Sequence, residues 1–222
     1  GYDGHNYTDE ILEIHPSSGR TAVIGHLPSA RAFLAAAEAE GKIYAIGGWD
    51  GQHFLDDVVE IDRVTGEAKV IAHLPSEREL LGAAAVGGKL YAIGGEDNNW
   101  NYLDEIVTID PSSGEARVIG HLPSGRARFA VAEVDGKIYV IGGWSDGKLD
   151  EIVEIDPSTG AIKVMGSLPS GRADLAAVEV KGKIYAIGGC VGRDFLDQIT
   201  IAEIDPAAGS ARDLPHPSFF GW

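Results

Sequence analysis

The stretch GKIYAIGG at residues 41–48 returns three times along the chain, as GKLYAIGG at 88–95, GKIYVIGG at 136–143 and GKIYAIGG at 182–189. Consecutive copies begin 47, 48 and 46 residues apart. An LPS tripeptide and a DPxxG-type turn fall between the copies in a constant order. Several motifs that interleave in one register identify a repeat protein.

Each repeat predicts four short strands. A run of small residues such as RFAVAEV from Arg128 comes first, and the KIYAI segment before the GG pair comes second. The third, such as DEIVEID from Asp150, alternates with the period of two that is typical of a strand. The DPxxG turn then leads into the fourth, because its proline presets φ and its glycine supplies a positive φ. Four antiparallel strands in about 45 residues, with no helical periodicity, indicate an all-β protein made of propeller blades.

Over nearly its whole length the chain resembles the kelch-repeat β-propellers. The GG pairs carry the resemblance, together with a tyrosine three residues before each pair and an arginine before each first strand. These residues are Tyr44, Tyr91, Tyr139 and Tyr185, and Arg31, Arg78, Arg126 and Arg172. One departure is that the family usually has a tryptophan on the fourth strand, where this chain has Val23, Val70, Val118 and Val164. The resemblance implies a kelch-type β-propeller.

The repeats predict a single propeller domain over 1–222, with four complete four-stranded blades and an N-terminal half blade. The predicted parts are the half blade 1–28, repeats at about 29–75, 76–123, 124–169 and 170–215, and a tail, 216–222. This count leaves three alternatives: a fragment of a longer propeller, a five-bladed ring with one thin blade, or a unit that pairs with another copy. Because unpaired strand edges are templates for association, self-association through the incomplete blade is one expectation. Phe219, Phe220 and Trp222 are predicted to cover the gap.

The loops after the GG pairs differ most between repeats and are the first candidate binding surface. Variable loops on a repetitive scaffold are where recognition normally lies. Exposed aromatic side chains beside Asp and Asn suit either sugar stacking or a protein hot spot. The alternative is that the first aromatic residue of each loop only caps its own blade. The candidate ligand-binding residues in these loops are Trp49, Asp50, Glu96, Asn98, Trp100, Trp144, Asp146 and Arg193.

The four recurring arginines are the second candidate surface. The kelch arrangement implies that Arg31, Arg78, Arg126 and Arg172 lie around the central axis, and characterised kelch domains use some arginines at this position to contact acidic peptides. Guanidinium groups in a pocket would favour carboxylate or phosphate ligands. The alternative is that each arginine bridges adjacent blades. Arg128 and Asp174 break the repeat pattern near this face and are therefore also candidate ligand-binding residues.

Recurring histidines precede the LP dipeptides, at His26, His73 and His121. We interpret them as strand-end residues, with metal binding as the alternative. Acidic residues at the starts of the third strands are expected to bind backbone amides in turns, with calcium as the alternative. These are Asp9, Asp57, Asp104, Asp150 and Asp197. The prediction is that the protein has no metal site and no cofactor.

Composition excludes several classes of function. With 34 acidic and 18 basic residues the net charge is −16, which repels phosphate backbones and argues against nucleic-acid binding. The single cysteine, Cys190, excludes an internal disulfide framework and a cysteine-rich zinc site. No apolar run approaches the ~20 residues that a membrane-spanning helix needs. The first ten residues lack the features of a signal peptide.

The sequence therefore predicts a noncatalytic binding scaffold for a protein or glycan, which acts through the loops after the GG pairs and an axial arginine ring. HExxH, GxSxG and GxxxxGK[ST] motifs are absent, and no ligand set matches the kelch-like copper oxidases. The alternative is a mutarotase- or lyase-like enzyme that acts on an acidic sugar through Glu96, Arg128 and Asp174. The DPSTG and LPSGR motifs are similar to those of bacterial and archaeal kelch proteins, which are often exported, so an extracytoplasmic location is expected.

Overall fold

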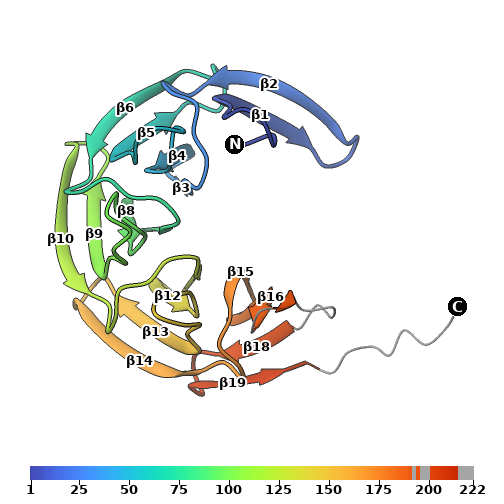
Figure 1. The fold of residues 1–222 in the computed structure, drawn as a ribbon, viewed down its shortest axis with the longest axis vertical. Coiled ribbons are helices and arrows are strands. Elements are labelled where there is room, and N and C mark those ends of the chain that lie inside the picture. Colours follow the sequence, from blue (N-terminus) through green and yellow to red (C-terminus); the bar gives the residue numbers. More distant parts are fainter. Residues whose placement is uncertain (192–193, 196–200, 215–222) are drawn as a thin grey trace, which may run out of the picture. The chain divides into compact units, whose positions relative to one another are not determined.

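The computed structural model describes residues 1–191, 194–195 and 201–214, and every regular element in these residues is a β-strand (Figure 1). The described residues include no helix that is long and apolar enough to span a membrane. The contacts divide the chain into two compact units, Gly1–Ala127 and Arg128–Trp222, and each is described by itself.

The first unit contains a two-stranded sheet and two four-stranded sheets, each an antiparallel meander in chain order. The two-stranded sheet pairs β1 (Glu10–His15) with β2 (Arg20–His26). The next sheet consists of β3 (Ala35–Ala39), β4 (Lys42–Ile46), β5 (Asp57–Ile61) and β6 (Ala68–His73). The third consists of β7 (Gly82–Val86), β8 (Lys89–Ile93), β9 (Glu105–Asp110) and β10 (Glu115–His121).

The second unit repeats this pattern in two further sheets. One consists of β11 (Ala130–Val134), β12 (Lys137–Ile141), β13 (Glu151–Asp156) and β14 (Ala161–Ser167). The other consists of β15 (Ala173–Val180), β16 (Lys183–Val191), β18 (Ile201–Asp205) and β19 (Ser210–Asp213), and β17 (Asp194–Phe195) pairs with the end of β16. These are the four complete blades and the N-terminal half blade that the repeats predict, so the all-β propeller prediction is confirmed.

Other predictions about the ends of the chain are not tested. The tail 216–222, with Phe219, Phe220 and Trp222, lies outside the described residues, as do Arg193 and Asp197. The assignment of 1–222 to a single domain and self-association through the half blade stay predictions.

The two middle strands of each complete blade form the core. Ile46 in β4 and Val58 in β5 are fully buried, and so are Ile93 and Ile106 at the equivalent positions of the next blade. Blade faces pack against each other within a unit, as β3 does against β7 and β11 against β15. Burial on both faces explains why β5 carries the consecutive apolar residues Val58 and Val59, both fully buried.

The outermost strands explain the missing tryptophan. The valines of the fourth strands are exposed, with Val23 at 49% and Val164 at 47%. A tryptophan at these positions would add a large apolar side chain to the surface without a core to receive it.

The GG pairs fix the loops that follow them. Gly47 and Gly48 have φ angles of 62° and 106°, which favour glycine. A Cβ atom on Gly47 would lie 2.6 Å from the Arg78 carbonyl oxygen, and one on Gly48 would lie 2.7 Å from that of Ala32. Arg78 belongs to the next repeat and Ala32 to the same repeat as the glycines. The glycine pair therefore lets the loop pack closely against both repeats.

Under the loops, a glutamate on the third strand organises a buried charge network in three of the complete blades. In the third blade Glu154 accepts a hydrogen bond from the Tyr139 hydroxyl at 3.0 Å and pairs with Lys137 at 2.9 Å and Lys163 at 3.0 Å. Burial favours the neutral carboxyl, but the two lysines outweigh it and lower the pKa of Glu154. The second blade differs, because Thr108 occupies the glutamate position in β9.

Equivalent networks surround Glu60 in the first blade and Glu203 in the fourth. Burial, together with the charge of Glu60, raises the pKa of Tyr44 to about 12. Hydrogen bonds from Lys183 and Arg212 lower the pKa of Glu203 to about 2. Each network therefore keeps its tyrosine neutral and its glutamate charged near neutral pH.

Candidate functional site

The four recurring arginines are buried, with at most 1% of each residue exposed. In the second blade the Arg78 guanidinium donates to the Gly94 carbonyl at 3.2 Å, to the Ser76 hydroxyl at 2.7 Å and to Glu105 Oε2 at 2.6 Å. Arg31 makes the same contacts in the first blade, with Gly47, Ser29 and Asp57. The side chain of each arginine is thus bound within its own blade.

The arginine backbone contacts the preceding blade instead. The Arg78 N–H donates to the Leu55 carbonyl at 3.0 Å, and the Arg78 carbonyl accepts from the Gly48 N–H at 2.9 Å. In the second unit the Arg172 N–H and carbonyl bond Leu149 and Gly143 in the same way. This geometry favours a structural role for the arginines over ligand binding, because the guanidinium groups are buried, but it corrects the expected bridging: the arginine backbone, not the side chain, contacts the neighbouring blade.

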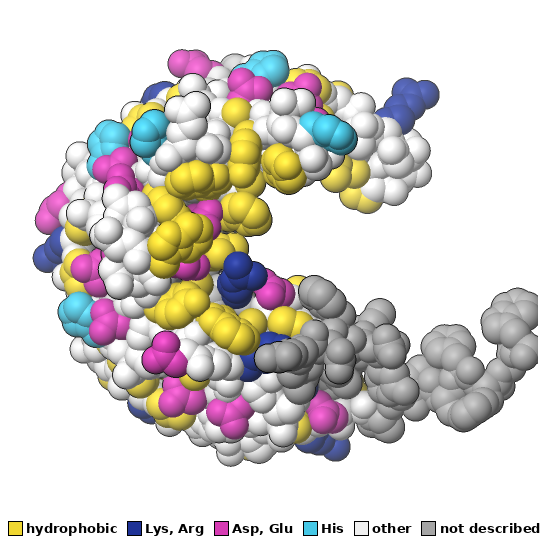
Figure 2. Space-filling model, in the orientation of Figure 1, with side chains coloured by type: hydrophobic (Ala, Val, Ile, Leu, Met, Phe, Trp, Pro, Cys, Tyr) yellow, Lys and Arg dark blue, Asp and Glu magenta, His cyan; other side chains and the backbone are white. Residues whose placement is uncertain are grey.

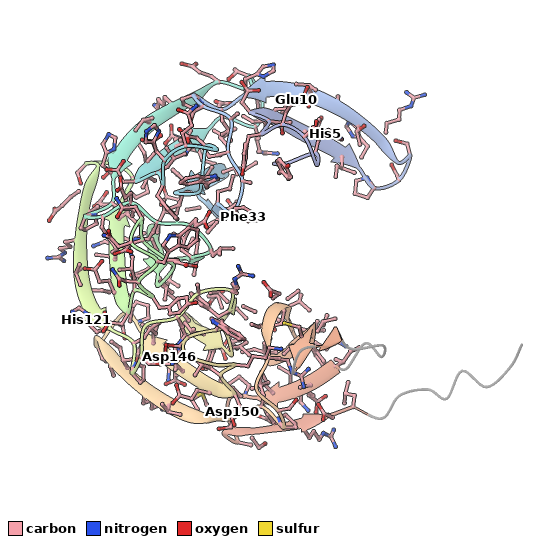
Figure 3. All side chains as sticks on the ribbon, viewed as in Figure 1. His5, Glu10, Phe33, His121, Asp146 and Asp150 are labelled. Atoms are coloured by element: carbon pink, nitrogen blue, oxygen red, sulfur yellow. The ribbon has the colours of Figure 1, made fainter. Side chains whose placement is uncertain are left out.

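Two residues after each arginine, one position has the same unusual backbone in all four complete blades. Phe33, Leu80, Arg128 and Asp174 have φ angles of 57°, 54°, 59° and 55°, in the left-handed region that non-glycine residues rarely adopt. The Leu80 N–H donates to the Phe33 carbonyl at 2.9 Å, and the Asp174 N–H donates to the Arg128 carbonyl at 2.8 Å. We call this the display position, because one backbone geometry presents a different side chain in each blade; Figure 3 labels Phe33.

In the second unit the display position brings Arg128 and Asp174 together. Arg128 Nη1 lies 3.6 Å from Asp174 Oδ1, and both side chains are about half exposed. Glu96, the third residue of the predicted enzyme site, lies in the first unit, is only 6% exposed, and pairs through its backbone with Glu79 and Tyr102. The φ angles of Arg128 and Asp174 do not single them out as catalytic, because Phe33 and Leu80 share them.

Five aromatic side chains of the first unit form what we call the aromatic pocket. Its members are Tyr7, Phe33, Trp49, Phe54 and Trp100, which come from four loops far apart in the sequence. Hydrophobic side chains gather over the loops around β3, β4 and β8 on the face that Figure 2 shows. Two adjoining cavities of about 330 Å³ and about 200 Å³ share Trp49, Phe54 and Trp100 as lining residues.

Ring contacts hold the pocket together. The Phe54 ring centroid lies 4.8 Å from that of Trp49 and 5.9 Å from that of Trp100, both edge-to-face. A Cβ atom on Gly51 would lie 2.9 Å from the Tyr7 ring, which places that ring against the Trp49 loop. Phe54 is buried, whereas Phe33 is 50% exposed and Trp100 is 68% exposed. The pocket therefore has a fixed base and an open rim.

Acidic and amide side chains border these rings. Glu77 and Asn98 line the larger cavity, and the Asn98 amide donates to the Glu77 carboxylate. Glu79 lines the smaller cavity and is 6% exposed. The lining of both cavities contains carboxylates but no lysine or arginine.

Asp50 and Asp97 shape the loops that carry the two tryptophans. Asp50 Oδ1 accepts the backbone N–H groups of Gln52 and His53, each at 2.7 Å. Partial burial favours the neutral acid, but these hydrogen bonds outweigh it and lower the pKa of Asp50. Asp97 Oδ1 accepts the N–H groups of Asn99 and Asn101 around Trp100. Asp50, a predicted ligand-binding residue, thus bonds its own loop.

The third blade presents its loop tryptophan differently. Lys148 Nζ lies 6.0 Å from the centroid of the Trp144 ring, within the range of a cation–π contact. Asp146 is exposed on the same loop, and Figure 3 labels it. The remaining predicted residue, Arg193, lies outside the described residues.

The recurring histidines form ion pairs with acidic residues at the starts of the third strands. The pairs are His26 with Asp9, His73 with Asp56 and His121 with Asp104, with Nδ1 to Oδ1 distances of 2.9–3.0 Å. These contacts correct two expectations. Asp9 and Asp104 bond histidines rather than backbone amides, and Asp56 rather than Asp57 is the equivalent residue in the first blade.

Asp56, Asp57 and His73 also come close enough to hold a metal ion, with ligand atoms within 4.8 Å of one another. Asp57 Oδ2, however, accepts the Arg31 hydrogen bond at 3.0 Å. Hydrogen bonding to Asp56 raises the pKa of His73, which favours the protonated form that cannot ligate a metal through Nδ1. These observations favour the ion pair.

The sequence identified Trp49, Asn98 and Trp100, which line the larger cavity, but not the other walls of the pocket. Phe54 belongs to the WDGQHF loop, one of the variable loops predicted to bind a ligand. Phe33 aligns with Arg128 and Asp174, which were predicted because they break the repeat pattern. Both residues could therefore have been predicted from the repeat alignment. Nothing in the sequence linked Tyr7, Glu77 or Glu79 to these residues.

Comparison with known proteins agrees with the repeat pattern. The family model for the KLHDC2/KLHL20/DRC7 Kelch-repeats domain is similar to this chain over residues 16–189, which is more than half of its length. A search of curated proteins found no match.

Proposed function

The chain belongs to the kelch-repeat family, and from this premise we propose that it is a noncatalytic binding module that recognises a protein or a glycan through the aromatic pocket. One observation carries the proposal: rings from four separate loops converge on adjoining cavities and remain open at the rim. A cavity of about 330 Å³ lies at the lower end of the range of roughly 300–1,000 Å³ that is typical of ligand sites.

The rim residues support binding rather than packing. Trp100 has a φ angle of 63°, a conformation that costs of order 1–3 kcal/mol for a non-glycine residue, whereas the φ of 57° at Phe33 is common to all four display positions and carries no such argument. The Trp100 and Phe33 side chains gain little from burial, because half or more of each is exposed. Large apolar side chains that are held exposed on a rigid scaffold are typical of interaction sites.

The arginine ring is not part of this proposal. Its guanidinium groups are buried and hydrogen-bonded within the blades, so their contribution is to position the loops that carry the pocket.

A peptide array and a glycan array, probed with the purified protein, test the proposal. Wild type should bind members of one array, and Trp100→Ala should weaken that binding about 10-fold or more, as truncation of a hot-spot tryptophan does. Trp144→Ala is the matched control and should bind as wild type does. The far-UV spectrum of Trp100→Ala should be unchanged, because most of the side chain is exposed. Binding that is indifferent to Trp100, or no binding to either array, would contradict the proposal.

A further inference from the structure

We propose that the aromatic pocket receives a cationic side chain, an arginine or a lysine, from a basic segment of a partner protein. This inference rests on the proposed function and names the chemistry of its ligand. It follows from the arrangement of the rings, from the charges beside them and from a contact that the chain makes within itself.

The aromatic rings line an open rim, where Phe33 and Trp100 are half or more exposed. Phe54 presents an edge-to-face contact to both Trp49 and Trp100, so the three rings are fixed in orientation before any ligand arrives. Tyr7 and Phe33 complete the lining of the smaller cavity. Cations are attracted to the faces of aromatic rings, most strongly to those of tryptophan, and arginine is the commoner partner. A neutral apolar ligand could also bind these rings, so the rings alone do not decide the ligand.

The charges beside the rings favour a cationic ligand. Glu79 is a lining residue with only 6% exposure, and a carboxylate in such a place attracts a cation more strongly than one in water does. Glu77 stands at the larger cavity, held by the Asn98 amide, and a carboxylate fixed in this way can accept a guanidinium. The lining residues of the larger cavity include His53 but no lysine or arginine, and those of the smaller cavity include no basic residue. The chain as a whole, with a net charge of −16, favours a basic partner as well.

The third blade shows the same chemistry within the chain. Trp144 follows its GG pair as Trp49 does, and Lys148 of the same loop lies over its ring. In the Trp49 loop the corresponding stretch, DGQHF, contains no lysine. A partner's cation at Trp49 and Trp100 would reproduce the contact that Lys148 makes at Trp144.

The test uses the indole N–H resonances of the ¹⁵N-labelled protein. The probe is the peptide acetyl-Gly-Gly-Arg-Gly-Gly-amide, and its control has citrulline, a neutral isostere, in place of arginine. The arginine peptide should shift the Trp49 and Trp100 resonances saturably and leave Trp144 unshifted. The citrulline peptide should bind about 10-fold more weakly, which corresponds to the loss of a cation–π contact and a charged hydrogen bond.

Two variants locate the charge. Glu79→Gln should weaken binding of the arginine peptide several-fold and leave the affinity for the citrulline peptide unchanged. Asp146→Asn, on the Trp144 loop, is the matched control and should leave both affinities unchanged. If Glu79→Gln does not fold, Glu77→Gln carries the same test at a surface residue. Equal affinity for the two peptides would overturn the inference, and so would an arginine peptide that shifts neither indole.

The two proposals fail in different ways. A chitotriose or neutral peptide that shifts Trp49 and Trp100 when the arginine peptide does not would leave the pocket a binding site and overturn only its cationic ligand. Array binding that does not depend on Trp100 would overturn the proposed function itself, and with it this inference.

Discussion

The loops after Gly48 and after Gly143 start with the same residue on the same backbone, yet they present it differently. Both begin with a tryptophan, and in both the second glycine of the GG pair donates to the carbonyl of an equivalent arginine, Arg78 or Arg172. Trp49 stands in a cavity with other aromatic rings, whereas Trp144 has Lys148 over its ring. A repeated scaffold leaves its exposed positions free to differ, so the proposed binding site is argued from the departures from the repeat rather than from the repeat itself.

The same two regions also differ beneath the loops. Strand β9, in the blade of Trp100, has Thr108 where β13, in the blade of Trp144, has Glu154. The blades of Trp49 and Trp100 end in the pairs of His73 and His121 with aspartates, and the blade of Trp144 has Ser167 at that position. Four experiments test these differences.

Removing a buried arginine should have the largest effect. Arg78→Met keeps the length of the side chain but leaves Glu105 and the Gly94 carbonyl without their guanidinium partner. Breaking a buried ion pair in this way costs about 3–5 kcal/mol, so the urea midpoint should fall sharply. The indole resonances of Trp49 and Trp100 should move, whereas that of Trp144, whose loop is bonded to Arg172, should stay. A loss below about 1 kcal/mol, the range of a surface change, would refute a structural role for the buried guanidinium.

Restoring the missing glutamate should stabilise the second blade. In Thr108→Glu the new carboxylate would stand opposite Tyr91 and Arg117, in the register that Glu154 has with Tyr139 and Lys163. The Thr108 hydroxyl is buried with no hydrogen-bond partner among the described residues, so no contact is lost. We expect a gain of about 1 kcal/mol, measured as a higher Tm. Glu154→Thr is the reciprocal control and should lower the Tm; an unchanged or lower Tm for Thr108→Glu would contradict the expectation.

Uncovering Trp144 should make the two loops alike. Lys148→Ala removes the cation over the ring, so the arginine peptide should now shift the Trp144 resonance, with a gain of about 0.5–1 kcal/mol for an exposed cation–π contact. The shifts at Trp49 and Trp100 serve as the internal control and should not change. If the Trp144 resonance does not shift in Lys148→Ala, a tryptophan without a covering lysine is not enough to bind a cation on this scaffold.

The histidine pairs should have the smallest effect, and it should depend on pH. Hydrogen bonds donated to the Asp56 and Asp104 carboxylates raise the pKa of His73 and His121 above the usual 6.5. A histidine whose pKa is raised in the folded state stabilises the protein fully at pH values below its pKa in the unfolded state. This stabilisation is lost as the pH rises through the pKa of the folded state. The Tm should therefore fall slightly between about pH 6 and pH 8.5, and less so in His73→Gln and His121→Gln. Ser167→Ala is the control without a titrating group. A Tm that rises over this interval in wild type alone would contradict the sign.

The fold could be predicted almost completely from the sequence, because its evidence is local. The strand pattern of residues 150–156 and the DPSTG turn that follows are properties of neighbouring residues, and the structure places β13 and β14 there, with residues 152–155 of β13 all buried rather than alternating. The GG pairs marked the end of the second strand in each repeat, and both glycines of every pair have a positive φ. The half blade followed from the alignment of residues 1–10 with 48–57.

The site was predictable only in part. Trp49 and Trp100 were identified because they stand out from aligned loops, and Phe33 occupies an alignment position that was already conspicuous. The arginines had two interpretations that no spacing could separate, since a guanidinium in a pocket and one between blades have the same place in the repeat.

By itself, then, the sequence determined the blades, their order and the loops that vary, because hydrogen-bond pairing and turn formation depend on residues close together in the chain. Only the tertiary structure decided that the arginines are buried, that Lys148 lies over Trp144, and that Tyr7, Phe33 and Glu79 line the same cavity as Trp100. These residues meet because blades pack face to face, and which side chains that packing buries or leaves open is set by contacts between distant segments.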